Sequence, residues 1–140
     1  MTQDNAMLEE GDQCLLDFTK IAKFEDGRLE VIPVAVQNVD TKEVILIAYT
    51  NEKALQRTLQ TRTATFWSTS RNELWTKGLE SGNTFEVCDI RVNCEQNSLV
   101  YQVRPTAGGI CHTSNSDNRA RNCYYRRLDM ESGLLENMDP

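Results

Sequence analysis

Three cysteines in the second half of the chain have the chemistry of metal ligands: Cys94, Cys111 and Cys123. Cys94 ends a predicted strand, whereas Cys111 and Cys123 lie in a polar loop that offers a thiol little core in which to pack. Three thiolates can bind Zn²⁺ tetrahedrally and leave a fourth position for water, which is the arrangement of a catalytic zinc site. The alternative is that these are buried or incidental thiols, because no paired C-x-x-C strengthens the case for a metal.

His112 is the one histidine of the chain and directly follows Cys111. Its imidazole has an ordinary pKa suited to proton transfer at neutral pH, so we predict that it is a general acid–base catalyst. A lone histidine more often packs or lies at the surface, and its place beside a candidate ligand is what favours catalysis. Thr113 and Ser114 follow it, so the H-x-E motif of zinc deaminases is absent and that class is excluded.

The segment 67–82 concentrates hydroxyl groups, two cations and two tryptophans. Arg71 offers a forked donor for phosphate and Lys77 a point charge, and the serines add further donors. A polar hairpin with core tryptophans would have the same composition, so both interpretations stand. The predicted substrate-binding residues are Trp67, Ser68, Ser70, Arg71, Lys77 and Ser81. Four arginines around Cys123 form either a second phosphate clamp or a solvated loop rim: Arg119, Arg121, Arg126 and Arg127.

Patterns of β-branched and alternating residues predict the strands that position these groups. Val31–Val39 and Glu43–Tyr49 flank a polar turn and predict a hairpin. Thr63–Ser68 and Glu73–Lys77 predict two short strands around a polar corner. From Cys88 onward the strand Phe85–Cys94 alternates between apolar and polar residues. Its predicted core face consists of Cys88, Ile90, Val92 and Cys94.

One main helix is predicted over Glu52–Gln60, with Asn51 as its N-cap. Leu55 and Leu59 lie four residues apart and would share its buried face. Leu16–Phe24 fits either a strand or a helix. Further alternation at Leu99, Tyr101 and Val103, and a last strand over Tyr124–Leu128, complete an α+β fold made mostly of antiparallel sheet.

Length and composition limit the class of protein. With 140 residues and 39% hydrophobic residues, the chain suffices for a single domain over residues 1–140. The longest apolar run, Val44–Tyr49, is too short to span a bilayer, and residues 1–13 have no basic or apolar leader region. We therefore expect a cytoplasmic protein without a membrane partner. Five cysteines, an odd number, favour thiols or metal ligands over a disulfide framework.

The net charge of −6 is unevenly distributed. Residues 1–30 hold eight acidic and three basic residues, and residues 129–140 hold four acidic residues and no basic one. These acidic ends are expected to be flexible. Residues 31–128 hold twelve basic and nine acidic residues, a mild cationic bias that suits a small phosphorylated ligand. A nucleic-acid-binding domain would have a stronger basic stripe, so that class of partner is excluded.

Several short motifs follow one another in order along the chain. They are Trp67-Ser-Thr-Ser-Arg71, Leu74-Trp-Thr-Lys-Gly78, Ser81-Gly82, Cys94, Cys111-His112 and Cys123-Tyr-Tyr-Arg126. In this order they resemble the phosphoribosyl-AMP cyclohydrolase family of histidine biosynthesis, with its pattern W-S-x-S-R, L-W-x-K-G, S-G, D-C-D-x-D, C-H and C-F-Y-R. Short stretches earlier in the chain are also similar to that family, so the resemblance covers roughly residues 16–127.

The resemblance implies an intertwined homodimer, with zinc bound by three cysteines drawn from both subunits. Carried over by position, these ligands are Cys94, Cys111 and Cys123. The implied reaction is hydrolysis of the N1–C6 bond of the adenine ring of phosphoribosyl-AMP, with His112 relaying the proton to N1. A phosphorylated purine nucleotide is therefore the expected small-molecule substrate. Its two phosphates suit the cationic middle of the chain.

One departure from the family concerns a second metal. The family motif D-C-D-x-D supplies three carboxylates for Mg²⁺, whereas this chain has Asn93, Glu95 and Asn97. On an extended strand these side chains would point together, opposite Cys94. Because Mg²⁺ prefers anionic oxygen ligands, we expect the magnesium site to be weakened or lost.

Two rivals to the simple function follow from the departures. A diverged paralogue would hydrolyse another N-substituted purine or cyclic amidine nucleotide. A catalytically silent, zinc-stabilised dimer would bind a nucleotide or a partner protein. Asn93, Asn97 and the longer loop between Cys111 and Cys123, with its extra residues within 115–122, favour it. The intact pair Cys111-His112 and the segment 67–82 favour an enzyme instead.

Overall fold

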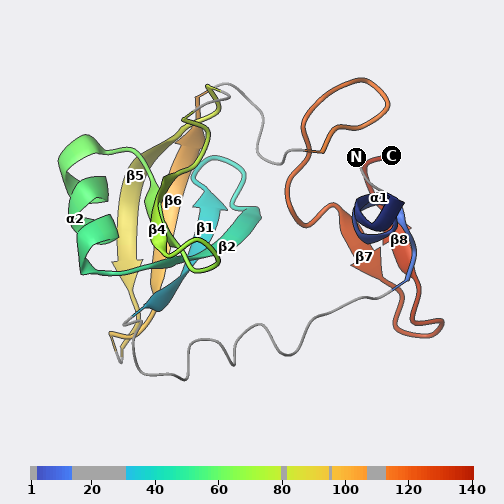
Figure 1. The fold of residues 1–140 in the computed structure, drawn as a ribbon, viewed down its shortest axis with the longest axis horizontal. Helices are drawn as coiled ribbons and strands as arrows, with labels where there is room; N and C mark the ends of the chain where they lie inside the picture. Colours follow the sequence, from blue (N-terminus) through green and yellow to red (C-terminus); the bar gives the residue numbers. More distant parts are fainter. Residues whose placement is uncertain (1–2, 14–30, 80–81, 95, 107–112) are drawn as a thin grey trace. The chain divides into compact units, whose positions relative to one another are not determined.

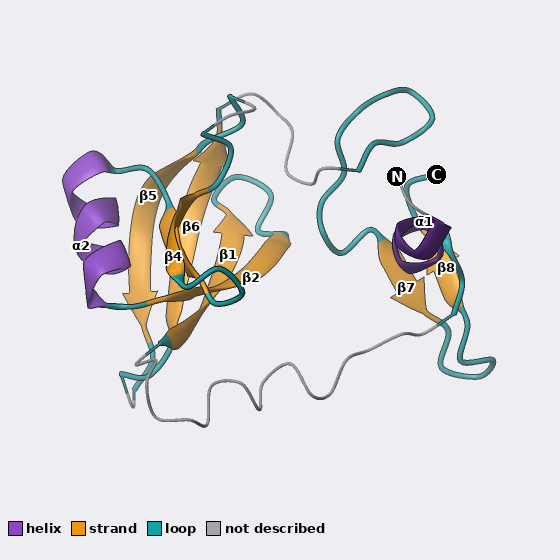
Figure 2. Cartoon of the chain, viewed as in Figure 1, coloured by secondary structure: helices purple, strands orange, loops and turns teal. Residues whose placement is uncertain are grey.

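The computed structural model describes residues 3–13, 31–79, 82–94, 96–106 and 113–140. They belong to two compact units, one within Met1–Leu29 and Cys111–Pro140 and the other within Glu30–Ile110. Figure 2 shows helix and strand in both units. The predicted element Leu16–Phe24 lies outside the described residues.

The larger unit is built on a four-stranded sheet with the strand order β2-β1-β6-β5 (Figure 1). β1 (Ile32–Asn38) and β2 (Val44–Thr50) pair in antiparallel fashion, which confirms the predicted hairpin. β6 (Leu99–Pro105) pairs antiparallel with β5 (Phe85–Val92) and parallel with β1. The expected α+β class with mostly antiparallel sheet is therefore confirmed.

One face of this sheet carries the hydrophobic core. Strand pairing places Val34 beside Ala48 and Leu99, and Val36 beside Leu46 and Tyr101. All of these side chains are buried, as the alternation of a half-buried sheet requires. The fully buried hydrophobic residues of the sheet are Val34, Val36, Ile45, Phe85, Tyr101 and Val103.

A β-bulge at Cys88 changes which residues of β5 face the core. The pairing register skips Cys88, so the alternation shifts by one position there. Phe85 and Val87 before the bulge and Ile90 after it pack on the core. The predicted placement of Cys88, Val92 and Cys94 on the core face is wrong, and Val92 is 55% exposed. Both thiols are exposed, since Cys88 occupies the bulge and Cys94 lies beyond the end of the strand.

Helix α2 (Glu52–Thr61) begins as predicted. The side-chain oxygen of Asn51 accepts a hydrogen bond of 2.9 Å from the backbone N–H of Ala54, which confirms the N-cap. Ala54 is buried, whereas Leu59 is 55% exposed. The prediction that Leu55 and Leu59 share a buried face is therefore wrong for Leu59.

A small hairpin packs between the sheet and α2. Its strands β3 (Thr65–Ser68) and β4 (Glu73–Thr76) confirm the two short strands predicted around a polar corner. The Phe66 ring stacks on Tyr101 with ring centroids 5.8 Å apart. On the other side, the Thr58 hydroxyl of α2 is 3.0 Å from both a backbone N–H and a carbonyl of β3. The hairpin is thus fixed from two sides.

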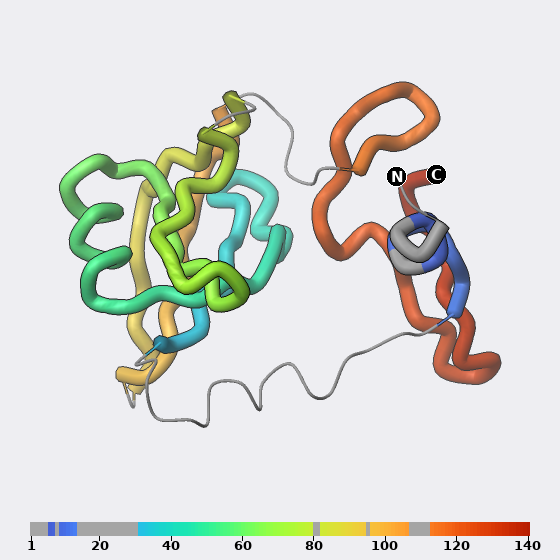
Figure 3. Tube along the Cα trace, in the orientation of Figure 1, coloured from blue at the N-terminus to red at the C-terminus, as the bar shows by residue number. Residues whose placement is uncertain are grey.

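The smaller unit consists of α1 (Gln3–Glu10), β7 (Arg126–Leu128) and β8 (Leu135–Asn137). β7 and β8 pair in antiparallel fashion, and β7 lies inside the strand predicted near the C-terminus. The acidic ends, expected to be flexible, therefore contribute helix α1 and strand β8. Figure 3 traces the orange loop before β7, where Ser114 and Ala120 form an isolated bridge. Within the described ranges, no helix combines the length and apolar composition needed to cross a membrane.

Candidate functional site

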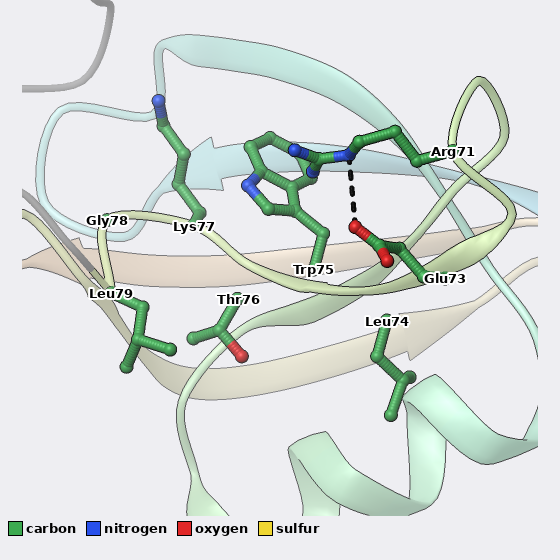
Figure 4. A pocket seen from close by; sticks show the side chains of 8 residues that line it. All are labelled: Arg71, Glu73, Leu74, Trp75, Thr76, Lys77, Gly78 and Leu79. Atoms are coloured by element: carbon green, nitrogen blue, oxygen red, sulfur yellow. Dashed lines mark ion pairs between the residues drawn. The ribbon is translucent and has the colours of Figure 1, made fainter.

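A pocket of about 390 Å³ lies along β4 and the residues on either side of it (Figure 4). Two of the predicted substrate-binding residues, Arg71 and Lys77, line this pocket. Alternation along the strand places Glu73, Trp75 and Lys77 on one side, while Leu74 points toward the helix in Figure 4. The pocket therefore combines one aromatic ring, two cations and one carboxylate.

The Trp75 ring is held from both the core and the pocket. Phe66 lies beneath it, with ring centroids 5.8 Å apart at an interplanar angle of 44°. On the pocket side, Lys77 Nζ lies 5.9 Å from the centroid of the Trp75 ring, which is within the range of a cation–π interaction. The aromatic surface offers a stacking partner for a flat heterocycle, and the cation beside it offers a partner for an anionic group.

Arg71 has its guanidinium engaged by neighbours. Its Nε lies 3.4 Å from Glu73 Oε1 and 3.3 Å from Ser68 Oγ, and the Ser68 hydroxyl also accepts from the Arg71 backbone N–H at 3.3 Å. Ser70 Oγ lies 3.4 Å from Ser68 Oγ. The Arg71–Glu73 pair is more than half exposed, so it is weak and an incoming anion can compete with the carboxylate.

Three predicted substrate-binding residues that the structure describes, Trp67, Ser68 and Ser70, are not among the residues that line this pocket. The Trp67 indole donates a 3.3 Å hydrogen bond to Asn72 Oδ1, and Trp67 is not among the residues that line the pocket. Ser81 lies outside the described residues.

Gly78 lies near the end of the pocket-lining segment, in a turn that requires glycine. Its φ is +79°, in the left-handed region, and a Cβ at this position would lie 2.0 Å from the carbonyl oxygen of Asn83. The turn closes with a 2.8 Å hydrogen bond from the backbone N–H of Gly82 to the Gly78 carbonyl. This turn fixes the backbone directly after Lys77.

Two of the three cysteines predicted to bind zinc lie among the residues that the structure describes. Cys94 and Cys123 are exposed thiols, one in each unit. Cys111 and His112 lie outside the described residues, and within the described part no group of three or more His, Cys, Asp or Glu gathers. Surface thiols outside the core have the donor chemistry that zinc prefers, so the two described residues fit the ion. All three ligand assignments and the acid–base role of His112 remain predictions.

The described residues do not fit magnesium. β5 ends at Val92, so the residues after it form a turn rather than the extended strand assumed from sequence. Asn93 and Asn97 do meet, but as neutral amides hydrogen-bonded to each other at 2.6 Å. Glu95 lies outside the described residues. No chemical step is assigned to magnesium.

The arginines around Cys123 have mainly structural contacts. Arg121 is buried and lies 2.7 Å from Glu10, and Arg126 donates a 3.0 Å hydrogen bond to the carbonyl of Gly11. Arg127 pairs with Glu136 at 2.5 Å. These contacts stabilise the smaller unit and leave the idea of a second phosphate clamp without support at these positions.

Sequence reasoning left two pocket residues without a role, Trp75 and Glu73. Both occur in the segment 67–82, and both share the strand parity of Lys77. That parity was the signal for Trp75. For Glu73 the same parity was not enough, because a carboxylate beside two cations looks in sequence like any surface residue.

Comparison with known proteins shows which family this chain is similar to. The family model described as phosphoribosyl-AMP cyclohydrolase matches residues 46–125, which include β3, β4 and the pocket. A protein named phosphoribosyl-AMP cyclohydrolase from Hyphomonas neptunium is 42% identical over 113 residues, covering 81% of this chain and 79% of the relative. Proteins of the same name from Archaeoglobus fulgidus and Cenarchaeum symbiosum are 46% and 45% identical, over 71% and 70% of this chain and 86% and 85% of their own lengths.

The class of protein is thus a hydrolytic enzyme, a cyclohydrolase. The chain belongs to the phosphoribosyl-AMP cyclohydrolase family, which confirms the resemblance drawn from its motifs.

Proposed function

We propose that this protein opens the adenine ring of phosphoribosyl-AMP by hydrolysing its N1–C6 bond, as a cytoplasmic, zinc-dependent step of histidine biosynthesis. The observation that carries the proposal is that the family match spans the segment forming the pocket with Arg71, Trp75 and Lys77. A nucleotide with two phosphates needs cations, and a purine needs a flat apolar surface. The pocket offers both.

The residues of the pocket bind and orient the substrate in this proposal. Lys77 and Arg71 neutralise phosphate charge, and Arg71 exchanges Glu73 for the phosphate when the substrate binds. Ser68 holds the Arg71 backbone and side chain, so it keeps the guanidinium directed at the pocket. The Trp75 ring, fixed by Phe66, gives the purine a surface to pack on.

The chemistry follows from the substrate. Substitution at N1 makes the ring amidine readily cationic, so C6 is electrophilic and water adds there. The N1–C6 bond then breaks, C6 keeps the incoming oxygen and its exocyclic nitrogen as a carboxamide, and N1 takes a proton. Cys94, Cys111 and Cys123 would hold zinc, which would supply the nucleophile by lowering the pKa of a bound water to about 7. His112 relays the proton to N1.

The test is turnover of phosphoribosyl-AMP by the zinc-loaded protein, followed by the ring-opening change in absorbance. We expect Cys94→Ser to lose most bound zinc and turnover. Cys88→Ser is the matched control, because Cys88 is also an exposed thiol on the same strand region but has no assigned role. Wild-type turnover no higher than that of Cys94→Ser would refute the proposal. Full zinc content in Cys111→Ser would refute the ligand assignment.

The role of His112 has a separate test. His112→Ala should retain zinc and lose turnover by about 10²–10⁴-fold, as expected for removal of a general acid–base catalyst. The loss should depend on pH, because an imidazole ordinarily exchanges its proton near neutral pH. An unchanged rate would dismiss this role while leaving the zinc site intact.

We also propose that the enzyme is a homodimer whose zinc sites draw cysteines from both subunits. The sheet face opposite the core supports this, since Ala35, Tyr49 and Val100 are half-buried there and Ile47 is 47% exposed. Ile47→Glu should convert the dimer to monomer in sedimentation. Mixing Cys94→Ser with Cys123→Ser should restore part of the activity if those two ligands come from different subunits. A monomeric wild-type protein would contradict the proposal.

One observation favours a diverged substrate within the same reaction class. The amide pair Asn93–Asn97 replaces acidic residues of the family motif, which changes the charge beside Cys94. A diverged enzyme would turn over another N1-substituted purine nucleotide faster than phosphoribosyl-AMP. Comparing kcat/KM across such nucleotides decides between the two substrates.

A further inference from the structure

The turn between β5 and β6 is closed by one asparagine side chain. Asn93 Oδ1 accepts hydrogen bonds from the backbone N–H groups of Asn97 and Ser98, at 2.9 and 3.0 Å. Its backbone N–H bonds the Ser98 carbonyl at 3.3 Å, and its carbonyl accepts from Gln96 at 3.0 Å. Both lone pairs of the Asn93 amide oxygen are therefore in use.

The second contact of this turn joins two side chains. Asn93 Nδ2 donates a 2.6 Å hydrogen bond to Asn97 Oδ1. This contact needs a hydrogen-bond donor on one of the two side chains. Two carboxylates at these positions would place two anionic oxygens at hydrogen-bonding distance with no proton between them, and such a pair is repulsive unless a cation lies there.

We infer that the Asn93–Asn97 amide pair takes the place of a divalent cation, so that the turn carrying Cys94 is closed without magnesium. The amide N–H supplies the positive partner between the two side chains that a pair of carboxylates would lack. Mg²⁺ demands near-octahedral oxygen ligands, yet binding it here would break the three hydrogen bonds that close the turn. This inference rests on the geometry of the turn and does not depend on which bond the enzyme cleaves.

We expect the effects of substitutions at Asn93 and Asn97 on thermal stability to be non-additive. Asn97→Asp leaves the Asn93 amide as donor, and Asn93→Asp leaves the Asn97 amide as donor after a flip. Each single variant should therefore unfold within a few degrees of the wild type and ignore Mg²⁺. The double variant Asn93→Asp/Asn97→Asp has no donor, so its Tm should fall by more than the sum of the single changes. Millimolar MgCl₂ should restore it.

The experiment uses the zinc-loaded full chain and measures thermal unfolding with and without MgCl₂. Binding of Mn²⁺, followed by electron paramagnetic resonance, gives a second readout that needs no enzymatic activity. We expect the wild-type Tm to move by no more than about 1 °C with MgCl₂, because an ion without a site adds no stability. We expect Mn²⁺ to bind the double variant and not the wild type.

Three outcomes would overturn the inference. One is stoichiometric Mn²⁺ binding by the wild type that Asn93→Ala abolishes. The others are single changes that simply add in the double variant, and a double variant that does not respond to Mg²⁺. If the double variant fails to fold, the wild-type Mn²⁺ measurement still decides. Asn118→Asp is the matched control, since it adds the same charge to a turn residue with positive φ in the other unit.

Discussion

The two units of the molecule are stabilised by different interactions. In the larger unit the fully buried side chains are aromatic, aliphatic or hydroxyl-bearing, with Tyr101, Phe66 and Phe85 the largest. In the smaller unit, the buried residues among those described are Thr113, Arg121 and Tyr125. A buried guanidinium thus occupies a place that an aliphatic side chain would take in an ordinary core. Burial of apolar surface stabilises the first unit, whereas directed polar contacts stabilise the second.

Tyr125 is at the centre of the smaller unit. Arg121 and Arg126 both lie over its ring, with Cζ atoms 4.5 and 5.2 Å from the centroid, and the hydroxyl donates to the carbonyl of Glu9. Arg121 also donates to Glu10 at 2.7 Å and to the Asp139 carbonyl at 2.9 Å. Arg121 therefore joins α1 to the C-terminal segment. Such a unit depends on single contacts, while a hydrophobic core spreads its stability over many.

The largest effect is expected in the apolar core. Phe66→Ala removes a fully buried ring that packs on both Tyr101 and Trp75, so the free energy of unfolding of the larger unit should fall by about 3–5 kcal/mol. Urea denaturation measures the loss. Leu59→Ala is the control, because Leu59 is 55% exposed and its truncation should cost about 0.5 kcal/mol or less. Equal losses in the two variants would contradict the assignment of the core.

The next effect isolates the polar unit. Arg121→Ala removes the contacts to Glu10, Asp139 and the Tyr125 ring, and should destabilise the smaller unit by about 1–3 kcal/mol. Hydrogen exchange should rise in α1, β7 and β8 and stay unchanged in β1 and β6. Arg119→Ala changes an exposed arginine two positions earlier, and it should leave the backbone amides of all these elements as protected from exchange as in the wild type. Faster exchange throughout both units would mean that they do not unfold separately.

The larger unit was more accessible to sequence reasoning than the smaller one, for a physical reason. The hairpin of β1 and β2 and the Asn51 cap depend on local patterns, which the sequence displays directly. The bulge at Cys88 inserts one residue without changing composition, so the alternation alone placed Cys88 on the wrong face. Arg121 was predicted to belong to either a phosphate clamp or a solvated loop rim, and its structural role was missed because its partner Glu10 is distant in sequence.

The candidate site divides in the same way. Arg71 and Lys77 were predicted from residue type, and both line the pocket. Glu73 was missed, since its contact with Arg71 depends on the turn between β3 and β4. The amide pair of Asn93 and Asn97 was expected on an extended strand, but the chain turns after Val92 and brings the two together differently. Residue types predict chemistry, while turns decide which groups meet.

A smaller effect tests a single polar contact in the larger unit. Asn51→Ala removes the acceptor for the Ala54 N–H and should lower the free energy of unfolding by about 1 kcal/mol. Gln60→Ala, at an exposed position of the same helix, should change it by less than about 0.5 kcal/mol. Urea denaturation compares the two variants directly. If Asn51→Ala cost as much as Arg121→Ala, polar contacts would matter equally in both units.

The smallest expected effect is a change in pKa, which can be compared between one carboxylate of each unit. A hydrogen bond from Arg104 lowers the pKa of Asp40, and backbone hydrogen bonds from Ser132 and Glu131 lower the pKa of Asp129. Each lowered pKa contributes to the stability of the folded state. The contribution is present at pH values above the pKa of the same carboxyl group in the unfolded chain. It is lost as the pH falls through the pKa of that group in the folded chain. Carboxyl ¹³C titration should show that Arg104→Ala returns the pKa of Asp40 toward its ordinary value without moving that of Asp129. High salt should likewise weaken the shift at Asp40 more, because its partner is a full charge at the surface. A pKa of Asp40 that stays low in Arg104→Ala would mean that local backbone groups, as in the smaller unit, hold this carboxylate too.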